Sequence, residues 1–79
     1  MLILKDVLTD MAKAIVDDPD SVSVTETEEE NGDILLTLSV APDDMGRVIG
    51  RHGKIAKALR SIMKTASASV NKKVTVEIK

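Results

Sequence analysis

Two glycines three positions apart, Gly50 and Gly53, enclose Arg51 and His52 in the stretch of this sequence whose residue types and spacing suggest chemistry. Glycine permits backbone angles that other residues avoid, and it lets a ligand backbone approach within contact distance. A helix is expected to begin directly after Gly53, and the free N–H groups and positive dipole end of a helix N-terminus attract anions. The arrangement therefore predicts a clamp for a phosphate backbone.

Other readings of this loop remain open. It could be a plain turn between two helices, and the cations around it could be a solvated face. His52 is the sole histidine and cysteine is absent, so a zinc site would need carboxylates to complete its ligand set. No nucleophile–base pattern accompanies His52. We therefore expect no enzyme, no metal and no cofactor, and we expect His52 to contact a phosphate or a ribose.

The charges are divided unevenly along the chain. Residues 1–43 carry eleven acids against Lys5 and Lys13, a net charge of −9, whereas residues 44–79 carry nine Lys or Arg against Asp44 and Glu77, a net charge of +7. This division indicates that the second half meets a polyanion, although a charged surface without a ligand is the alternative. The acidic residues 28–30 are expected to form a solvated hairpin tip.

Length and composition limit the fold and the location. The 79 residues fit a single domain over residues 1–79, and 43% of them are hydrophobic, but none is Phe, Tyr or Trp. The core must be aliphatic, and stacking of bases on aromatic rings is excluded. No apolar run approaches the ~18 residues of a membrane span, and the chain does not start with a basic leader. We expect a soluble, cytoplasmic protein with no membrane partner.

The elements that would position the loop begin with an amphipathic helix over residues 2–17. The ring of Pro19 ends this helix because it disfavours helical backbone at Asp18. The helix packs through apolar residues at helical spacing, which are Leu4, Val7, Leu8, Met11, Ala14 and Ile15.

A hairpin follows, with a first strand around Val22 and Val24 and a second over residues 34–41. A two-residue turn would leave the apolar faces of the two strands mismatched. A three-residue loop over residues 30–32 pairs Val24 with Leu38 and Val22 with Val40, with Gly32 in the left-handed position. We therefore predict the three-residue loop.

The second half predicts a short helix over residues 44–49 capped by Asp43, a helix over 54–68, and a last strand containing Val74, Val76 and Ile78. The longer helix is expected to bury Ile55, Leu59, Ile62, Met63 and Ala66, with Lys54, Lys57, Ser61 and Lys64 on its opposite side.

The predicted order is helix, strand, strand, helix, helix, strand. Because two helices connect the last two strands, those strands should be parallel and joined by a right-handed crossover. We therefore predict an α+β fold with a three-stranded mixed sheet and three helices on one face.

The run MGRVIGRHGKI over residues 45–55 resembles the KH-domain signature, in which an apolar pair leads into a G-x-x-G loop between two helices. The predicted element order resembles the type II KH arrangement over essentially the whole chain. The length of the chain and the run GRVIGRHGKIAKALR are similar to the small bacterial KhpA family. One departure is Ala56, which stands where many KH domains have Ile or Leu.

The resemblance implies that the loop holds the backbone of about four nucleotides of single-stranded RNA. The bases would lie between the first helix of the motif and the middle strand, over Val48, Ile49 and residues 34–41. The absence of aromatic residues fits this reading and counts against RRM and cold-shock domains. The predicted RNA-binding residues are Arg47, Val48, Ile49, Gly50, Arg51, His52, Gly53, Lys54 and Lys57.

The resemblance also implies a non-catalytic post-transcriptional regulator or RNA chaperone that acts with partners. One small KH domain should bind RNA weakly, so we expect avidity through a homodimer or through a larger KH-containing protein of the KhpB kind. The expected homodimer interface is the region around residues 46–58, where it would compete with RNA. The alternative is a KH-fold dimerisation or protein-interaction module with little direct RNA binding.

Overall fold

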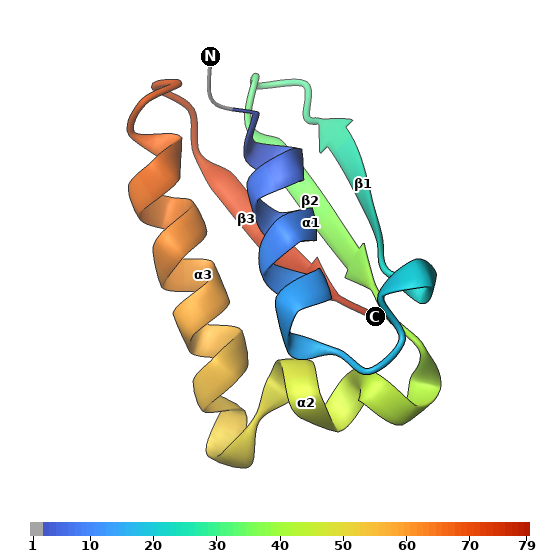
Figure 1. Ribbon diagram of the computed structural model, residues 1–79. Coiled ribbons are helices and arrows are strands. Elements are labelled where there is room, and N and C mark those ends of the chain that lie inside the picture. The colour runs from blue at the N-terminus through green and yellow to red at the C-terminus, as the bar shows by residue number, and fades with distance from the viewer. Residues whose placement is uncertain (1–2) are drawn as a thin grey trace.

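A computed structural model describes residues 3–79 and places three helices on one face of a three-stranded mixed sheet (Figure 1). The predicted α+β order is confirmed, although the predicted helix start at residue 2 lies outside the described residues. No helix within residues 3–79 is long and apolar enough to cross a membrane. The elements are α1 (Leu4–Ile15), β1 (Ser23–Glu28), β2 (Ile34–Ser39), α2 (Met45–Ile49), α3 (Lys54–Ser67) and β3 (Val74–Ile78).

The strands lie in the order β1-β2-β3, so β3 is an edge strand of the sheet. β1 pairs antiparallel with β2, and Val24 lies opposite Leu38 as predicted. β2 pairs parallel with β3, with Leu36 opposite Val76. The parallel pair confirms the crossover that the two intervening helices predict.

The hairpin between β1 and β2 has the predicted three-residue loop over residues 30–32. The Glu29 N–H donates to the Asp33 carbonyl at 2.7 Å, and the Gly32 N–H donates to the Glu29 carbonyl at 2.9 Å. Gly32 is left-handed, with φ of 89°. The β1 ladder starts at Ser23, so the predicted Val22–Val40 pair lies just beyond it, although both valines are buried.

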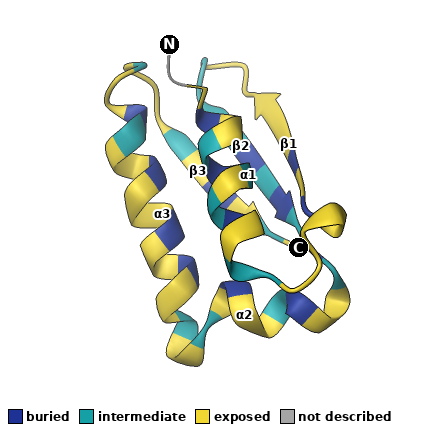
Figure 2. Ribbon diagram, viewed as in Figure 1, coloured by how far each residue is buried: buried dark blue, intermediate teal, exposed yellow. Residues whose placement is uncertain are grey.

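The core lies between the sheet and the helices and is entirely aliphatic (Figure 2). α1 contributes Leu4, Leu8 and Ala12, which lie four residues apart on one face. The predicted Ala14 is wrong, because it lies on the exposed side of the helix. α1 ends at Ile15 rather than at residue 17, and a short 3-10 turn over Pro19–Ser21 leads into β1.

α3 buries Leu59 and Met63 as predicted, and Ala66 packs against the core, but the rest of the predicted stripe is wrong. Ile55 and Ile62 are 36% and 48% exposed, whereas Ala56 and Ser67 are buried beside Leu59 and Met63. Leu59 lies on one side of α3 with Ile55 and Ile62, and on the adjoining side with Ala56 and Met63. The helix packs against the core through the second of these sides. The hydroxyl of Ser67 is satisfied, because it donates to the Lys64 carbonyl at 2.6 Å.

Candidate nucleic-acid interface

The loop between α2 and α3 is a tight turn that only glycine fits at its first position. Gly50 has φ of 75° and ψ of 172°, a conformation almost restricted to glycine. A Cβ atom there would lie 2.9 Å from the backbone nitrogen of Ile55, so the start of α3 packs directly against the Gly50 backbone. The Gly50 N–H ends α2 by donating to the Gly46 carbonyl at 2.9 Å.

The far side of the loop is open. His52 and Gly53 are both left-handed, with φ of 58° and 73°. A Cβ atom at Gly53 would meet nothing within 4 Å, so the positive φ rather than a clash makes glycine favourable there. The consecutive left-handed residues turn the chain sharply into α3. The loop lies at one end of the molecule (Figure 1), and Arg51 and His52 are exposed.

Apart from Arg47 and the two glycines, the predicted site residues separate into three groups by exposure. Arg51, His52, Lys54 and Lys57 are exposed at the loop and along the first turns of α3. Ile49 is 40% exposed beside the loop. Val48 is fully buried in the core, so it positions α2 and cannot itself touch a ligand.

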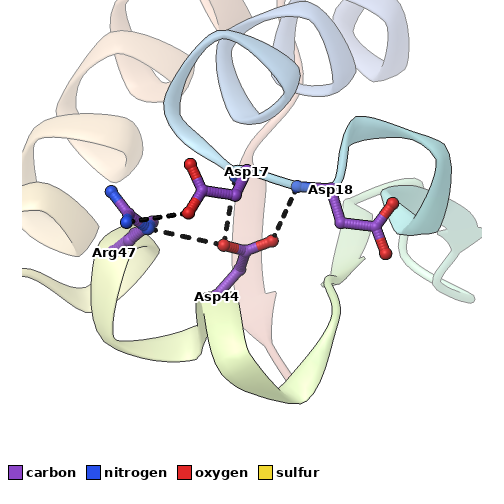
Figure 3. Close-up of polar contacts among 4 residues, drawn as sticks. All are labelled: Asp17, Asp18, Asp44 and Arg47. Atoms are coloured by element: carbon purple, nitrogen blue, oxygen red, sulfur yellow. Dashed lines mark hydrogen bonds and ion pairs between the residues drawn. The ribbon is translucent and has the colours of Figure 1, made fainter.

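Arg47 is held by two acids at the junction between α1 and α2 (Figure 3). Its Nη2 atom lies 2.8 Å from a carboxylate oxygen of Asp17, and its Nε atom lies 3.5 Å from a carboxylate oxygen of Asp44. These two ion pairs direct the Arg47 guanidinium toward the end of α1. Arg47 therefore supports the position of α2, and Asp17 and Asp44 offset its charge.

Asp44 is the buried centre of this junction, with 2% of its surface exposed. Its two carboxylate oxygens accept the backbone N–H groups of Asp17 and Asp18, each at 3.1 Å (Figure 3). The predicted cap, Asp43, is wrong: it is exposed, and no side chain caps α2. Asp44 instead fixes the end of α1 against the start of α2, and thereby the direction from which α2 enters the loop.

A groove runs between α3 and the edge strand β3. It has a volume of about 300 Å³ and mainly apolar walls. Its lining residues are Arg60, Lys64, Lys73, Val74, Thr75 and Val76.

The middle strand, over which the bases were predicted to lie, offers no exposed side chain on its helix-facing side. Leu36 and Leu38 of β2 are fully buried, because the helices cover this face of the strand. Arg60 and Lys64 were absent from the predicted site. Their spacing from Lys57, at i, i+3 and i+7, places the three cations in one row on α3 and could have pointed to the groove.

A second, apolar row lies on a different flank of α3. It contains Ile55 and Ile62, which are one heptad apart and both exposed. A shallow apolar hollow of about 360 Å³ surrounds Ile62, lined also by Ser61, Thr65 and Ala66. At 100° per residue, this row points away from the row of Lys57, Arg60 and Lys64.

Comparisons with known proteins place these features in a family. The family model described as the KH domain of KhpA/KhpB matches residues 5–78. RNA-binding protein KhpA of Clostridium acetobutylicum is 51% identical over 75 residues, which cover 95% of this chain and 99% of the relative. RNA-binding protein KhpA of Aquifex aeolicus is 42% identical over 78 residues, which cover 99% of this chain and 98% of the relative.

Two crystal structures of Era share the fold. Era of Aquifex aeolicus bound to GDP and AlF4− has a TM-score of 0.67 with 15% identity, and Era in complex with MgGDPNP and a segment of 16S ribosomal RNA has a TM-score of 0.68 with 15% identity. Each alignment covers 95% of this chain but only 29% and 28% of the respective Era chains. At this identity the likeness concerns the fold alone, and it fits a type II KH-like arrangement.

Proposed function

The chain belongs to the KhpA/KhpB family of KH domains, and on that premise we propose that it binds single-stranded RNA without catalysis, as a post-transcriptional regulator or RNA chaperone. The observation that carries the proposal is the loop at residues 50–53. Its backbone is open on the side of Gly53, its Arg51 and His52 side chains are exposed, and the 14-residue helix α3 begins directly after it. Backbone N–H groups, a helix N-terminus and nearby cations together suit a phosphate chain.

In this proposal the loop holds the sugar-phosphate backbone. Gly50, Arg51, His52 and Gly53 form the clamp, and Lys54 and Lys57 extend it along α3. Ile49, which is exposed beside the loop, can pack against a sugar or a base. Val48 and Arg47 act indirectly, because one is buried and the other is paired with Asp17 and Asp44.

The bases lie in the groove between α3 and β3. Its walls include the half-buried Val74, whose side chain offers apolar contact to a base without an aromatic ring. Arg60, Lys64 and Lys73 add positive potential along the same groove. The groove thus continues the positive row that starts with Lys57, near the loop.

Self-association is the second part of the proposal. One KH domain that grips about four nucleotides binds weakly, so a homodimer, or a larger KH-containing partner of the KhpB kind, would supply avidity. The exposed Ile55 and Ile62 favour an apolar interface along α3. The flank of Ile55 and Ile62 differs from that of the cations, which supports a dimer that leaves the groove open, rather than one that competes with RNA.

The alternative function is a dimerisation module with little direct RNA binding, and the apolar row on α3 is the observation that favours it. Fluorescence anisotropy with a labelled eight-nucleotide RNA, repeated between 50 and 200 mM salt, separates the two. Four phosphate contacts should make log K fall with log salt at a slope of roughly −3. Absence of binding, or binding that does not respond to salt, would favour the dimerisation module.

A further inference from the structure

The guanidinium of Arg60 is bonded to the edge of the sheet. Its Nε–H donates to the backbone carbonyl of Val76 at 3.4 Å, in a partly buried position. Arg60 comes from the middle of α3, and Val76 from the middle of β3, so the bond spans the groove between them.

The backbone N–H and C=O groups of successive residues in β3 point alternately toward β2 and toward the free edge of the sheet. The Ile34 N–H donates to the Lys73 carbonyl, and the Lys79 N–H donates to the Leu38 carbonyl, both at 2.9 Å. The odd-numbered residues of β3 therefore bond with β2, and alternation along a parallel ladder leaves the N–H and C=O groups of Val76 on the free edge. Arg60 thus occupies an acceptor that the edge strand would otherwise offer to a ligand.

The groove is consequently rich in hydrogen-bond donors. A guanidinium carries five N–H groups, so four remain on Arg60 after the bond to Val76. Lys64 and Lys73 add two ammonium groups, and no carboxylate is among the lining residues. A base that enters this groove meets cationic hydrogen-bond donors, because the Val76 carbonyl already accepts the bond from Arg60.

We propose that Arg60 makes the groove select keto bases, uracil and guanine, over the amino bases adenine and cytosine. The selection rests on the proposed function, since it requires that RNA bases enter the groove. The two classes differ at position 4 of the pyrimidines and position 6 of the purines: uracil and guanine carry a carbonyl oxygen there, whereas cytosine and adenine carry an amino group. Arg can also pair with O6 and N7 of guanine at once. That amino group would point its hydrogens at other donors, which is unfavourable in a partly buried site.

The test compares two labelled eight-nucleotide RNAs, one of alternating U and G and one of alternating C and A, by anisotropy at one salt concentration. The full chain should prefer the U/G sequence by about tenfold. Arg60→Gln should bring the ratio of the two affinities to about one. Arg60→Lys keeps the charge but lacks the planar fork, so it should also reduce the ratio while binding the C/A sequence like the unsubstituted chain.

Lys64→Gln is the matched control. Lys64 lies one turn further along α3, lines the same groove and carries the same charge. Its substitution should lower the affinity for both RNAs by the same factor and leave the ratio of the two affinities unchanged.

Three results would overturn the inference: equal affinity of the unsubstituted chain for both sequences, a U/G preference that survives in both Arg60 variants, or an equal fall for both RNAs on Arg60→Gln. The last result would make Arg60 a structural cap on the sheet edge. Thermal unfolding of each variant identifies any loss of fold, and Arg60→Lys keeps the aliphatic stem if Arg60→Gln proves unstable. If neither RNA binds the unsubstituted chain in a salt-dependent way, the proposed function itself fails.

Discussion

The backbone N–H of Asp17 donates a hydrogen bond at 3.1 Å to the buried carboxylate of Asp44, which is 27 positions away in the sequence. Asp44→Ala removes this bond, a second bond to Asp18 and one of the two acidic partners of Arg47. It should lower the free energy of unfolding by about 2–3 kcal/mol, because two partly buried N–H groups lose their acceptor. Urea denaturation followed by circular dichroism measures the change. Asp43→Ala, an exposed neighbour, should stay within ~0.5 kcal/mol, and equal effects at both positions would contradict the role given to Asp44.

The glycines of the loop region should respond differently to alanine. Gly50→Ala combines a backbone conformation that alanine avoids with a close contact to Ile55, so it should destabilise by about 2–4 kcal/mol. Gly53→Ala has no clash and should cost about 1 kcal/mol. Gly46→Ala, inside α2 and facing open space, should be neutral or stabilising by up to ~1 kcal/mol. Thermal denaturation of the three variants gives the order, and a Gly50→Ala protein as stable as Gly46→Ala would exclude the tight turn.

Replacing Arg51 and His52 by Asp should abolish RNA binding without loss of helix. Both side chains are exposed, and Asp tolerates the left-handed backbone of position 52. Two negative charges would then face the phosphates. Anisotropy measures the affinity, and far-UV circular dichroism measures the helix content.

The matched control for the loop variant is Lys5→Asp with Lys13→Asp on α1. These two exposed lysines lie outside the proposed site, and their replacement changes the net charge by a comparable amount. RNA binding should survive largely intact. Comparable losses in the two double variants would mean that binding follows net charge, and the clamp would be wrong.

The positive row on α3 predicts a local charge effect. Lys57→Glu should weaken all RNA sequences alike and reduce the salt slope by about one phosphate contact. Glu28→Lys, at the end of β1, should change affinity little, although it removes the 3.6 Å pair with Lys72. Salt titrations of both variants supply the comparison. If the two substitutions changed the RNA affinity by equal and opposite amounts, binding would follow net charge and the localised site would be wrong.

The apolar row on α3 predicts a homodimer at micromolar concentration. Ile62→Glu places a charge in the middle of the hollow formed with Ser61, Thr65 and Ala66, and should yield a monomer that still binds RNA. Ile3→Glu replaces another exposed isoleucine, outside that row, and should leave the dimer intact. Sedimentation at several concentrations, with and without RNA, measures both properties. A chain that stays monomeric at high concentration would remove the proposed interface.

The hairpin could be predicted from the sequence because its determinants are local. The side-chain period of two admits one pairing that places Val24 and Leu38 on the same face, and Gly32 suits the turn that this pairing needs. The loop at residues 50–53 was equally visible, since the two glycines mark backbone conformations that few other residues adopt.

The parts that sequence reasoning missed depend on contacts between distant segments. α3 has two adjoining apolar sides, and only the packing against the sheet decides that Ala56 is buried and Ile62 is exposed. The acids Asp17 and Asp44 would be expected to repel each other. The backbone N–H of Asp17 nevertheless donates to the carboxylate of Asp44, and Arg47 forms an ion pair with each acid. The groove depends on how the side chains of α3 pack beside the edge strand β3, and no local pattern encodes that packing.

The hairpin tip and the loop at residues 50–53 lie at opposite ends of the molecule (Figure 1), whose long dimension is 34 Å. Acidic residues 28–30 therefore sit several Debye lengths, each about 8 Å at physiological salt, from Arg51 and His52. A polyanion that drifts toward the protein is repelled by one end and attracted by the other, so encounters begin with the loop foremost. This orientation changes how often productive collisions occur rather than how long a complex lasts, and added salt erodes it first in the association rate.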